Sequence, residues 1–162
     1  MSISVALLIS LSSCAFAATL EGLCAGKNVK SYFAELKFPP YSAPLWIWYI
    51  IGAAYYAIFF FVIFHLLRLE NDSLLKTATI ALVLFMMVAN ALWNYLFFRA
   101  KNLFASFISG SLAPILDITL FICLIKLDKT AAWALVPYLI YRLYAVWWGY
   151  GLWKMNRPVL NS

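Results

Sequence analysis

Two asparagines lie within an apolar stretch of the chain, and their spacing from neighbouring aromatic residues suggests a pocket. An asparagine side chain in hydrocarbon costs free energy unless its amide is paired, so Asn90 and Asn94 should face protein or a cavity and not lipid. Trp93, Phe97 and Lys101 occur at spacings of three and four from them, which places all five side chains on one helical face. This face predicts a binding pocket with aromatic walls.

Residue sets that usually carry catalysis are absent from the sequence. The single histidine, His65, closes an apolar run and is expected at a helix end near the headgroups, and Asp117 is the only acid in its apolar segment. The chain has no glycine-rich phosphate loop, and its three cysteines lack metal-ligand spacing, so no metal site is expected. Aromatic faces, amides and cations at one end are surroundings that suit flat apolar macrocycles bearing carboxylates.

The composition is that of an integral membrane protein. Of the 162 residues, 66% are hydrophobic and 19% are aromatic, which is more apolar surface than a soluble domain of this size could bury. The net charge of +6 comes from lysines and arginines scattered at segment ends. This pattern is typical of membrane topology rather than nucleic-acid binding, so the lipid bilayer is the first expected partner.

Five apolar segments are each long enough to cross a bilayer as a helix, which takes about 20 residues. Their approximate bounds are Ile3–Leu23, Pro44–Leu67, Leu75–Phe98, Leu103–Ile125 and Ala131–Trp153. The connection over residues 25–43 is long and polar, and long loops in small proteins are usually functional. The sequence therefore predicts an all-α integral membrane protein, a five-transmembrane-helix bundle that forms a single membrane domain over residues 1–162.

The first apolar segment has two interpretations. Ala15-Phe16-Ala17 resembles the cleavage site of a secretory signal peptide, and Leu11-Ser12-Ser13-Cys14 resembles a lipoprotein cleavage box. Against both, Met1-Ser2 carries no lysine or arginine. We expect this segment to be retained as the first helix.

The basic residues also indicate an orientation. With five spans, the long loop and the C-terminus share one side, and that side carries seven basic residues: Lys27, Lys30, Lys37, Arg99, Lys101, Lys154 and Arg157. The opposite side carries four: Arg68, Lys76, Lys126 and Lys129. Because basic loops tend to stay in the cytoplasm, the long loop and the C-terminus are expected there.

Three stretches carry a family resemblance. The first stretch comprises Tyr32, Leu36-Lys37, Pro39-Pro40 and Pro44-Leu45-Trp46. The second stretch runs from Asn90 through Trp93 and Phe97-Phe98 to Lys101. The third stretch comprises Pro137-Tyr138-Leu139, Tyr150, Trp153-Lys154 and Asn156. In this order they resemble the translocator protein / tryptophan-rich sensory protein (TspO/MBR) family. The chain departs from the family pattern at Tyr95, Ala105, Tyr141 and Gly149, as a divergent member would.

The resemblance implies a five-helix bundle whose pocket opens toward the long loop. It also implies binding of porphyrin- or sterol-like hydrophobic ligands, a tendency to form homodimers, and a role in transport, stress sensing or tetrapyrrole breakdown. No cofactor is required, and a porphyrin or haem-like ligand is compatible with the pocket. The candidate ligand-binding residues are Pro44, Trp46, Tyr49, Asn90, Trp93, Phe97, Tyr141, Tyr144 and Trp148.

Three classes of function stay open at this point. The chain could bind or transport such ligands, degrade a bound tetrapyrrole with Trp and Tyr as redox-active side chains, or act as a structural partner in the membrane without a small ligand. Val146, Tyr150 and Lys154 match a proposed sterol-binding pattern. The alternative for these three residues is a tyrosine and a lysine that anchor a helix end at the headgroups.

Two charged residues are expected to meet inside the membrane. Asp117 and Arg142 lie in consecutive spans joined by a tight turn, at similar depths from that turn. A lone charge so deep in the bilayer is costly, so the two should face the interior and pair. In the alternative arrangement, Asp117 is protonated and Arg142 reaches toward the headgroups or bonds to carbonyl oxygens.

Overall fold

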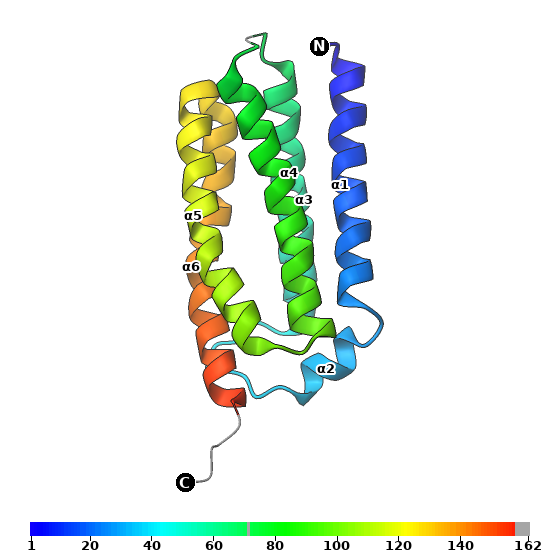
Figure 1. Cartoon of the computed structure of the whole chain (residues 1–162), viewed down its shortest axis with the longest axis vertical. Helices are drawn as coiled ribbons and strands as arrows, with labels where there is room; N and C mark the ends of the chain where they lie inside the picture. The colour runs from blue at the N-terminus through cyan, green and yellow to red at the C-terminus, as the bar shows by residue number, and fades with distance from the viewer. Residues whose placement is uncertain (71, 158–162) are drawn as a thin grey trace.

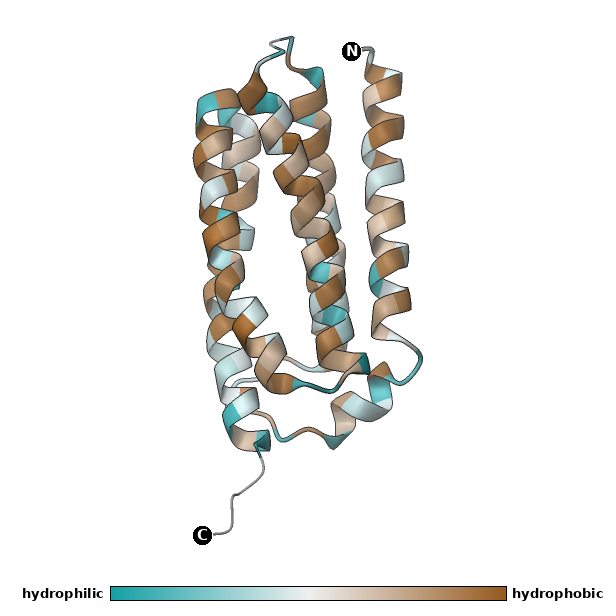
Figure 2. Cartoon of the chain, viewed as in Figure 1, coloured by the Kyte–Doolittle hydropathy of each residue, from teal (hydrophilic) through white to brown (hydrophobic). Residues whose placement is uncertain are grey.

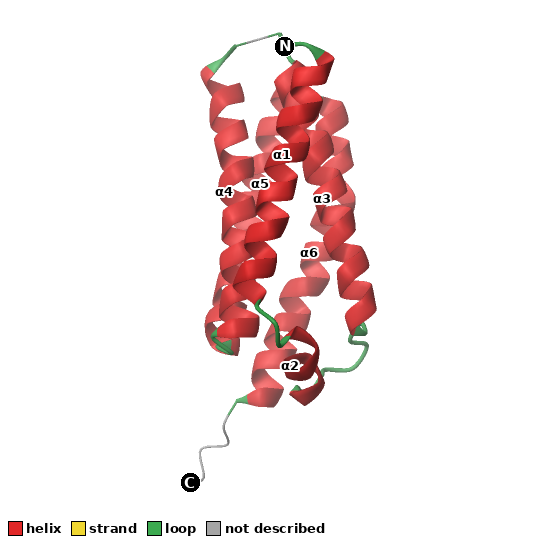
Figure 3. Cartoon of the chain, turned by 90° about the vertical axis from the view of Figure 1, so that its right-hand side faces the viewer, coloured by secondary structure: helices red, strands yellow, loops and turns green. Residues whose placement is uncertain are grey.

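The computed structural model describes residues 1–70 and 72–157, and these residues are all-helical. The elements are α1 (Ile3–Ala25), α2 (Val29–Glu35), α3 (Leu45–Arg68), α4 (Leu74–Asn94), the π-helical turn η1 (Tyr95–Arg99), α5 (Leu103–Leu127) and α6 (Lys129–Asn156). Except for α2, the α-helices run along one common direction as an upright bundle (Figure 1). The N-terminus lies at one end of the bundle, and α2 and the end of α6 lie at the other (Figures 1 and 3).

Polar residues in the turns set where several helices begin. Ser2 accepts a hydrogen bond from the backbone N–H of Val5 to cap α1, and Asn102 accepts one from Ala105 to cap α5. Ser73 caps α4 in the same way, because its side chain accepts a hydrogen bond from the N–H of Lys76. Such caps satisfy backbone N–H groups that have no partner inside the helix.

Two features of the backbone differ from the sequence prediction. The connection over residues 25–43 is not irregular throughout, because it contains the seven-residue helix α2. The third apolar segment also does not end as a regular α-helix, because the N–H of Ala100 donates to the carbonyl of Tyr95 at 2.8 Å in a wider π turn. π turns within helices are frequent at functional sites.

Four helices are long and apolar enough to cross a membrane, within the described residues: α1, α3, α4 together with η1, and α5. Figure 2 shows that hydrophobic residues run along these helices, whereas hydrophilic residues gather at the turns. α6 has 28 residues but is not one of the four. Its many tyrosines and tryptophans and Arg142 make it less apolar than the others.

The helices pack around two apolar clusters. One is formed by α1, α3, α4, α5 and α6 and includes the fully buried Phe59, Leu120 and Leu135. The other lies where α2 meets η1 and α6 and includes Tyr32 and Trp148. Along the bundle, α1 packs on α3 and α4, and α5 packs on α6.

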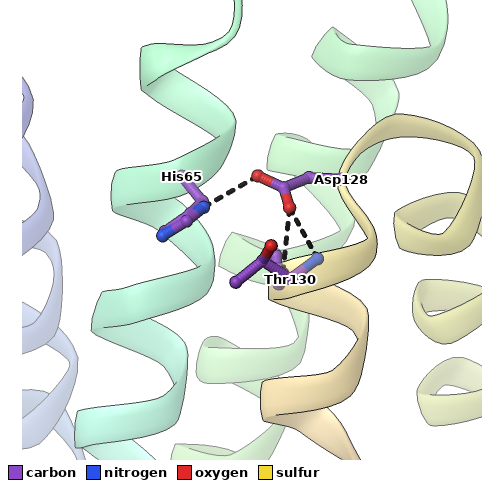
Figure 4. A network of polar contacts seen from close by, with 4 residues as sticks. His65, Asp128 and Thr130 are labelled. Carbon is purple, nitrogen blue, oxygen red and sulfur yellow. Dashed lines mark hydrogen bonds and ion pairs between the residues drawn. The ribbon is translucent and has the colours of Figure 1, made fainter.

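The turn between α5 and α6 is held by a polar cluster (Figure 4). Asp128 Oδ2 lies 2.7 Å from His65 Nδ1, and its Oδ1 accepts from the N–H groups of Thr130 and Ala131. Partial burial raises the pKa of the Asp128 carboxyl, but the bonds to His65 and to the two amides outweigh it and hold this pKa below its ordinary value. His65 is thus tied to a neighbouring turn rather than directed only at the headgroups.

Candidate functional site

A cavity of about 370 Å³ lies inside the bundle, between α1, α3, α4 and α6, with α2 at one end. This volume is within the range that holds small organic ligands. Members of both apolar clusters line it, among them Tyr55 and Tyr138 from the first and Phe97 and Trp148 from the second. The cavity therefore lies between the two apolar clusters.

One wall of the cavity is polar and is centred on Glu21 of α1. Its carboxylate accepts hydrogen bonds from Tyr56 Oη at 2.6 Å, from Asn90 Nδ2 at 2.9 Å and from Asn94 Nδ2 at 3.0 Å. Asn94 Nδ2 also donates to the backbone carbonyl of Asn90 at 3.1 Å. Both asparagine amides thus have the hydrogen-bond partner that their position in an apolar segment requires, and α1 provides it.

The remaining walls are largely aromatic. Trp48 and Trp148 lie with ring centroids 4.4 Å apart, and Trp93 stacks on Phe97 at 4.9 Å. Trp148 also lies 5.9 Å from Phe97, so rings from α3, α4, η1 and α6 form one continuous surface. Such a surface offers stacking faces to a flat ligand.

The long loop is fastened to the helices beside these rings. Trp148 Nε1 donates to Ser42 Oγ at 3.1 Å, and Trp48 Nε1 donates to the carbonyl of Ala43 at 3.0 Å. The N–H of Ala43 donates in turn to Tyr144 Oη at 3.0 Å. The indole and phenol polar atoms are thereby satisfied by the loop, which leaves the apolar ring faces available to the cavity.

The part of this loop that follows α2 is fixed to the end of α6. Asn156 Oδ1 accepts from the N–H of Lys37 at 2.9 Å, and Asn156 Nδ2 donates to the carbonyl of Lys37 at 2.8 Å. Pro39 packs so closely on Gly151 that a Cβ atom there would lie 2.9 Å from the Pro39 Cβ atom. A glycine at this position lets the loop approach the helix backbone.

Asp117 and Arg142 face each other within the bundle. Arg142 Nε lies 2.7 Å from Asp117 Oδ2, and the Asp117 side chain is 1% exposed. Arg142 also contacts the hydroxyl of Tyr138 and lies over its ring, with Cζ 4.8 Å from the centroid. Arg142 lines the cavity, so the pair lies at the edge of the candidate site.

A second hollow of about 430 Å³ lies between α4 and α5, and Asn90, Trp93 and Arg142 border both spaces. Trp93 crosses toward α5, where its Nε1 donates to the carbonyl of Ser106 at 3.0 Å. The same Nε1 would lie 3.3 Å from a Cβ atom at Gly110. The small residues Ser106 and Gly110 therefore leave room for Trp93 of their own chain.

Most of the candidate residues from the sequence come together at the cavity. Those that line it are Tyr49, Asn90, Trp93, Phe97, Tyr141 and Trp148. Pro44 and Trp46 do not line it: Pro44 precedes α3 as its cap residue, and Trp46 is 61% exposed. The residues of α3 that face the cavity are Leu45, Trp48, Tyr49, Ile51, Gly52, Tyr55 and Tyr56, and this face leaves Trp46 outside.

Two further predictions concern α6. Tyr144 does not line the cavity, because its hydroxyl is bonded to the loop at Tyr41 and Ala43. In the sterol-like pattern, Val146 borders a small space of about 70 Å³, while Lys154 Nζ lies 5.8 Å from the Tyr150 ring. All three residues lie outside the main cavity.

Sequence reasoning missed the centre of the polar wall. Glu21 lies inside the first apolar segment and is not among the residues that the sequence singled out, although the two amides of Asn90 and Asn94 required a partner. Trp48, Tyr55 and Tyr56 were missed as well, because α3 is apolar on all sides and its inward face is not marked by a polar stripe. Only the contacts between helices select that face.

The fold and the cavity define a helical membrane protein with an internal, aromatic-walled cavity. The TspO/MBR family model matches residues 9–154, so the chain belongs to the TspO/MBR family. A comparison with curated protein sequences gives no match. The family match includes α1 from residue 9 onward and reaches nearly to the end of α6.

Proposed function

We propose that this protein binds porphyrin- or sterol-like hydrophobic molecules in the cavity between α1, α3, α4 and α6. The observation that carries the proposal is the aromatic surface of Trp48, Trp93, Phe97 and Trp148, which lines a cavity of about 370 Å³ inside the bundle. Membership of the TspO/MBR family supports the same ligand class. Transport of the bound molecule is a further part of this proposal.

The proposal includes a membrane arrangement. α6 packs along α5 and reaches the end of the bundle where α2 lies, which supports α6 as a fifth membrane span (Figure 1). The long loop and the end of α6 then lie on the cytoplasmic side, where the basic residues are more numerous. A homodimer would form through the outer face of α4, where Phe85, Val88 and Leu92 are exposed.

The experiment that tests ligand binding is a porphyrin titration of the purified protein, followed by absorption spectroscopy in the light and in the dark. A spectral shift without loss of pigment supports binding. Conversion of the pigment into new products supports the second candidate, a tetrapyrrole-degrading enzyme, which the tyrosines and tryptophans of the cavity favour. If neither a porphyrin nor a sterol binds, the binding proposal is wrong and a structural role in the membrane is favoured.

Replacing Trp93 with alanine should weaken porphyrin binding about tenfold while the helices persist, because a stacking face is lost. Trp133→Ala is the matched control, since Trp133 is 70% exposed and does not line the cavity. Tryptophan fluorescence quenching measures the affinity, and circular dichroism measures the helix content. Equal affinity in Trp93→Ala and Trp133→Ala would remove Trp93 from the site.

A further inference from the structure

The charges around the cavity do not balance. Among the described residues that line it, Glu21 is the acidic one and Arg142 is the basic one. Arg142 is already paired with Asp117 at 2.7 Å. In the described part of the chain, no cation lies within ion-pair distance of Glu21, and its partners Tyr56, Asn90 and Asn94 are neutral. The carboxyl group of Glu21 on the polar wall therefore has no cation of the described protein beside it.

The same wall presents acceptors of hydrogen bonds to the cavity. An amide can donate only through its NH₂ group, so the bonds to Glu21 fix how Asn90 and Asn94 are oriented. The Oδ1 atoms of both asparagines have no donor in the described contacts. A carboxylate offers about four acceptor positions, and three donors reach Glu21. The wall can therefore accept further hydrogen bonds from a ligand.

Tyr55 provides a second, independent indication of a polar ligand group. Its side chain lines the same cavity and is 6% exposed, yet its hydroxyl has no hydrogen-bond partner among the described residues. A buried hydroxyl without a partner costs free energy. The Tyr55 hydroxyl can accept or donate a hydrogen bond and would gain a partner from a polar group that reaches it.

We propose that Glu21 is a specificity-determining residue, and that it selects lipophilic ring systems that present a protonated amine or an N–H group to this wall. The inference rests on the proposed binding function and narrows its ligand class. Aromatic walls take the ring system, and the acceptors on α1, α3 and α4 take the nitrogen. An open-chain tetrapyrrole meets this description through its pyrrole N–H groups, with its carboxylates away from Glu21.

Three anthracene derivatives of similar size test the inference on the unchanged protein in mild detergent at pH 7. They are 9-anthracenemethylamine, which is a cation, 9-anthracenemethanol, which is neutral, and 9-anthracenecarboxylate, which is an anion. Binding is followed by probe fluorescence. The amine should bind about tenfold or more tightly than the alcohol, because it gains charge-assisted hydrogen bonds, and the carboxylate should bind least.

Variants of Glu21 then assign the preference to one side chain. In Glu21→Gln the ratio of amine to alcohol affinity should fall close to one, whereas Glu21→Asp should keep part of it by keeping the charge. Glu35→Gln is the matched control, because Glu35 is 65% exposed, lies 3.8 Å from Lys101 and does not line the cavity. The ratio is measured within each variant, so a general loss of binding does not imitate the effect.

The outcomes separate the inference from the function on which it rests. If the unchanged protein binds the alcohol as tightly as the amine, or if Glu21→Gln keeps the parent ratio, the inference is wrong while ligand binding stands. If the protein binds no anthracene derivative, porphyrin or sterol, the proposed function itself fails. If Glu21→Gln does not fold, the relative affinities of the three probes for the unchanged protein still test whether the cavity prefers an amine.

Discussion

At the scale of single residues, Asp117 and Arg142 form the clearest interaction within the bundle, with 2.7 Å between Oδ2 and Nε. Asp117→Asn should lower the free energy of unfolding by about 3–5 kcal/mol, because it leaves a charged guanidinium without its partner. Adding Arg142→Leu should recover part of that loss. Thermal or denaturant unfolding in mild detergent measures all three variants, and strictly additive losses in this cycle would contradict the pairing.

The lowered pKa of Asp128 predicts how the stability of the protein depends on pH. The pKa of its carboxyl lies below the ordinary value of 3.8, so the stability it contributes is fully present above that value and is lost as the pH falls through the lowered pKa. The thermal midpoint of the parent should therefore decline below about pH 4 more steeply than that of Asp128→Asn. A parallel decline in both proteins would mean that Asp128 does not contribute.

Asp128→Ala separates the charge of this residue from its cap. Asparagine can still accept hydrogen bonds from the N–H groups of Thr130 and Ala131, whereas alanine cannot. At pH 7 the alanine variant should lose about 1 kcal/mol more than the asparagine variant.

At the scale of elements, Gly151 of α6 determines how closely the long loop packs. Gly151→Ala should free the loop, because the new Cβ atom would lie 2.9 Å from the Pro39 Cβ atom, even though alanine favours the helix by about 1 kcal/mol over glycine. Limited trypsin digestion at Lys37 should become faster. Gly149→Ala is the control, since its Cβ atom meets only Phe107 at 3.8 Å; equal cleavage in both variants would show that Gly151 does not hold the loop.

The elements also show what a sequence can predict here. The bounds of the five long helices lie within a few residues of the predicted apolar segments, although four of these helices qualify as membrane spans in the described part of the chain. Long apolar segments with polar ends are a clear signal, because a bilayer requires about 20 apolar residues. α2 was not predicted, since seven residues carry too little pattern and Tyr32 and Phe33 are ordered by packing near Phe97 and Trp148. The cavity shows the same limit of prediction from sequence. The sequence indicates that the amides of Asn90 and Asn94 need a partner, but that this partner is Glu21 depends on how α1 packs against α4.

At the scale of the whole molecule, the distribution of basic residues predicts the orientation in the membrane. After replacement of Cys14, Cys24 and Cys123 by serine, a cysteine introduced by Lys129→Cys should react with an impermeant maleimide on intact cells. A cysteine introduced by Lys30→Cys should react only after permeabilisation, because seven basic residues on its side favour the cytoplasm. The reverse labelling pattern would contradict the proposed orientation.

The association state is a second property of the whole molecule. Ser106 and Gly110 lie against Trp93 of the same chain. The exposed residues of α4 are the surface that the proposed dimer would use.

The pairing of α5 with α6 has a consequence for how the chain enters the bilayer during synthesis. α6 falls outside the set of helices that qualify as spans by length and composition, and it carries Arg142. Its partner α5 qualifies, supplies Asp117 to that arginine, and is separated from α6 by Asp128 alone. We expect the two helices to partition from the translocon together as one hairpin, with the carboxylate of the leading helix neutralising the guanidinium of the trailing one before either meets lipid.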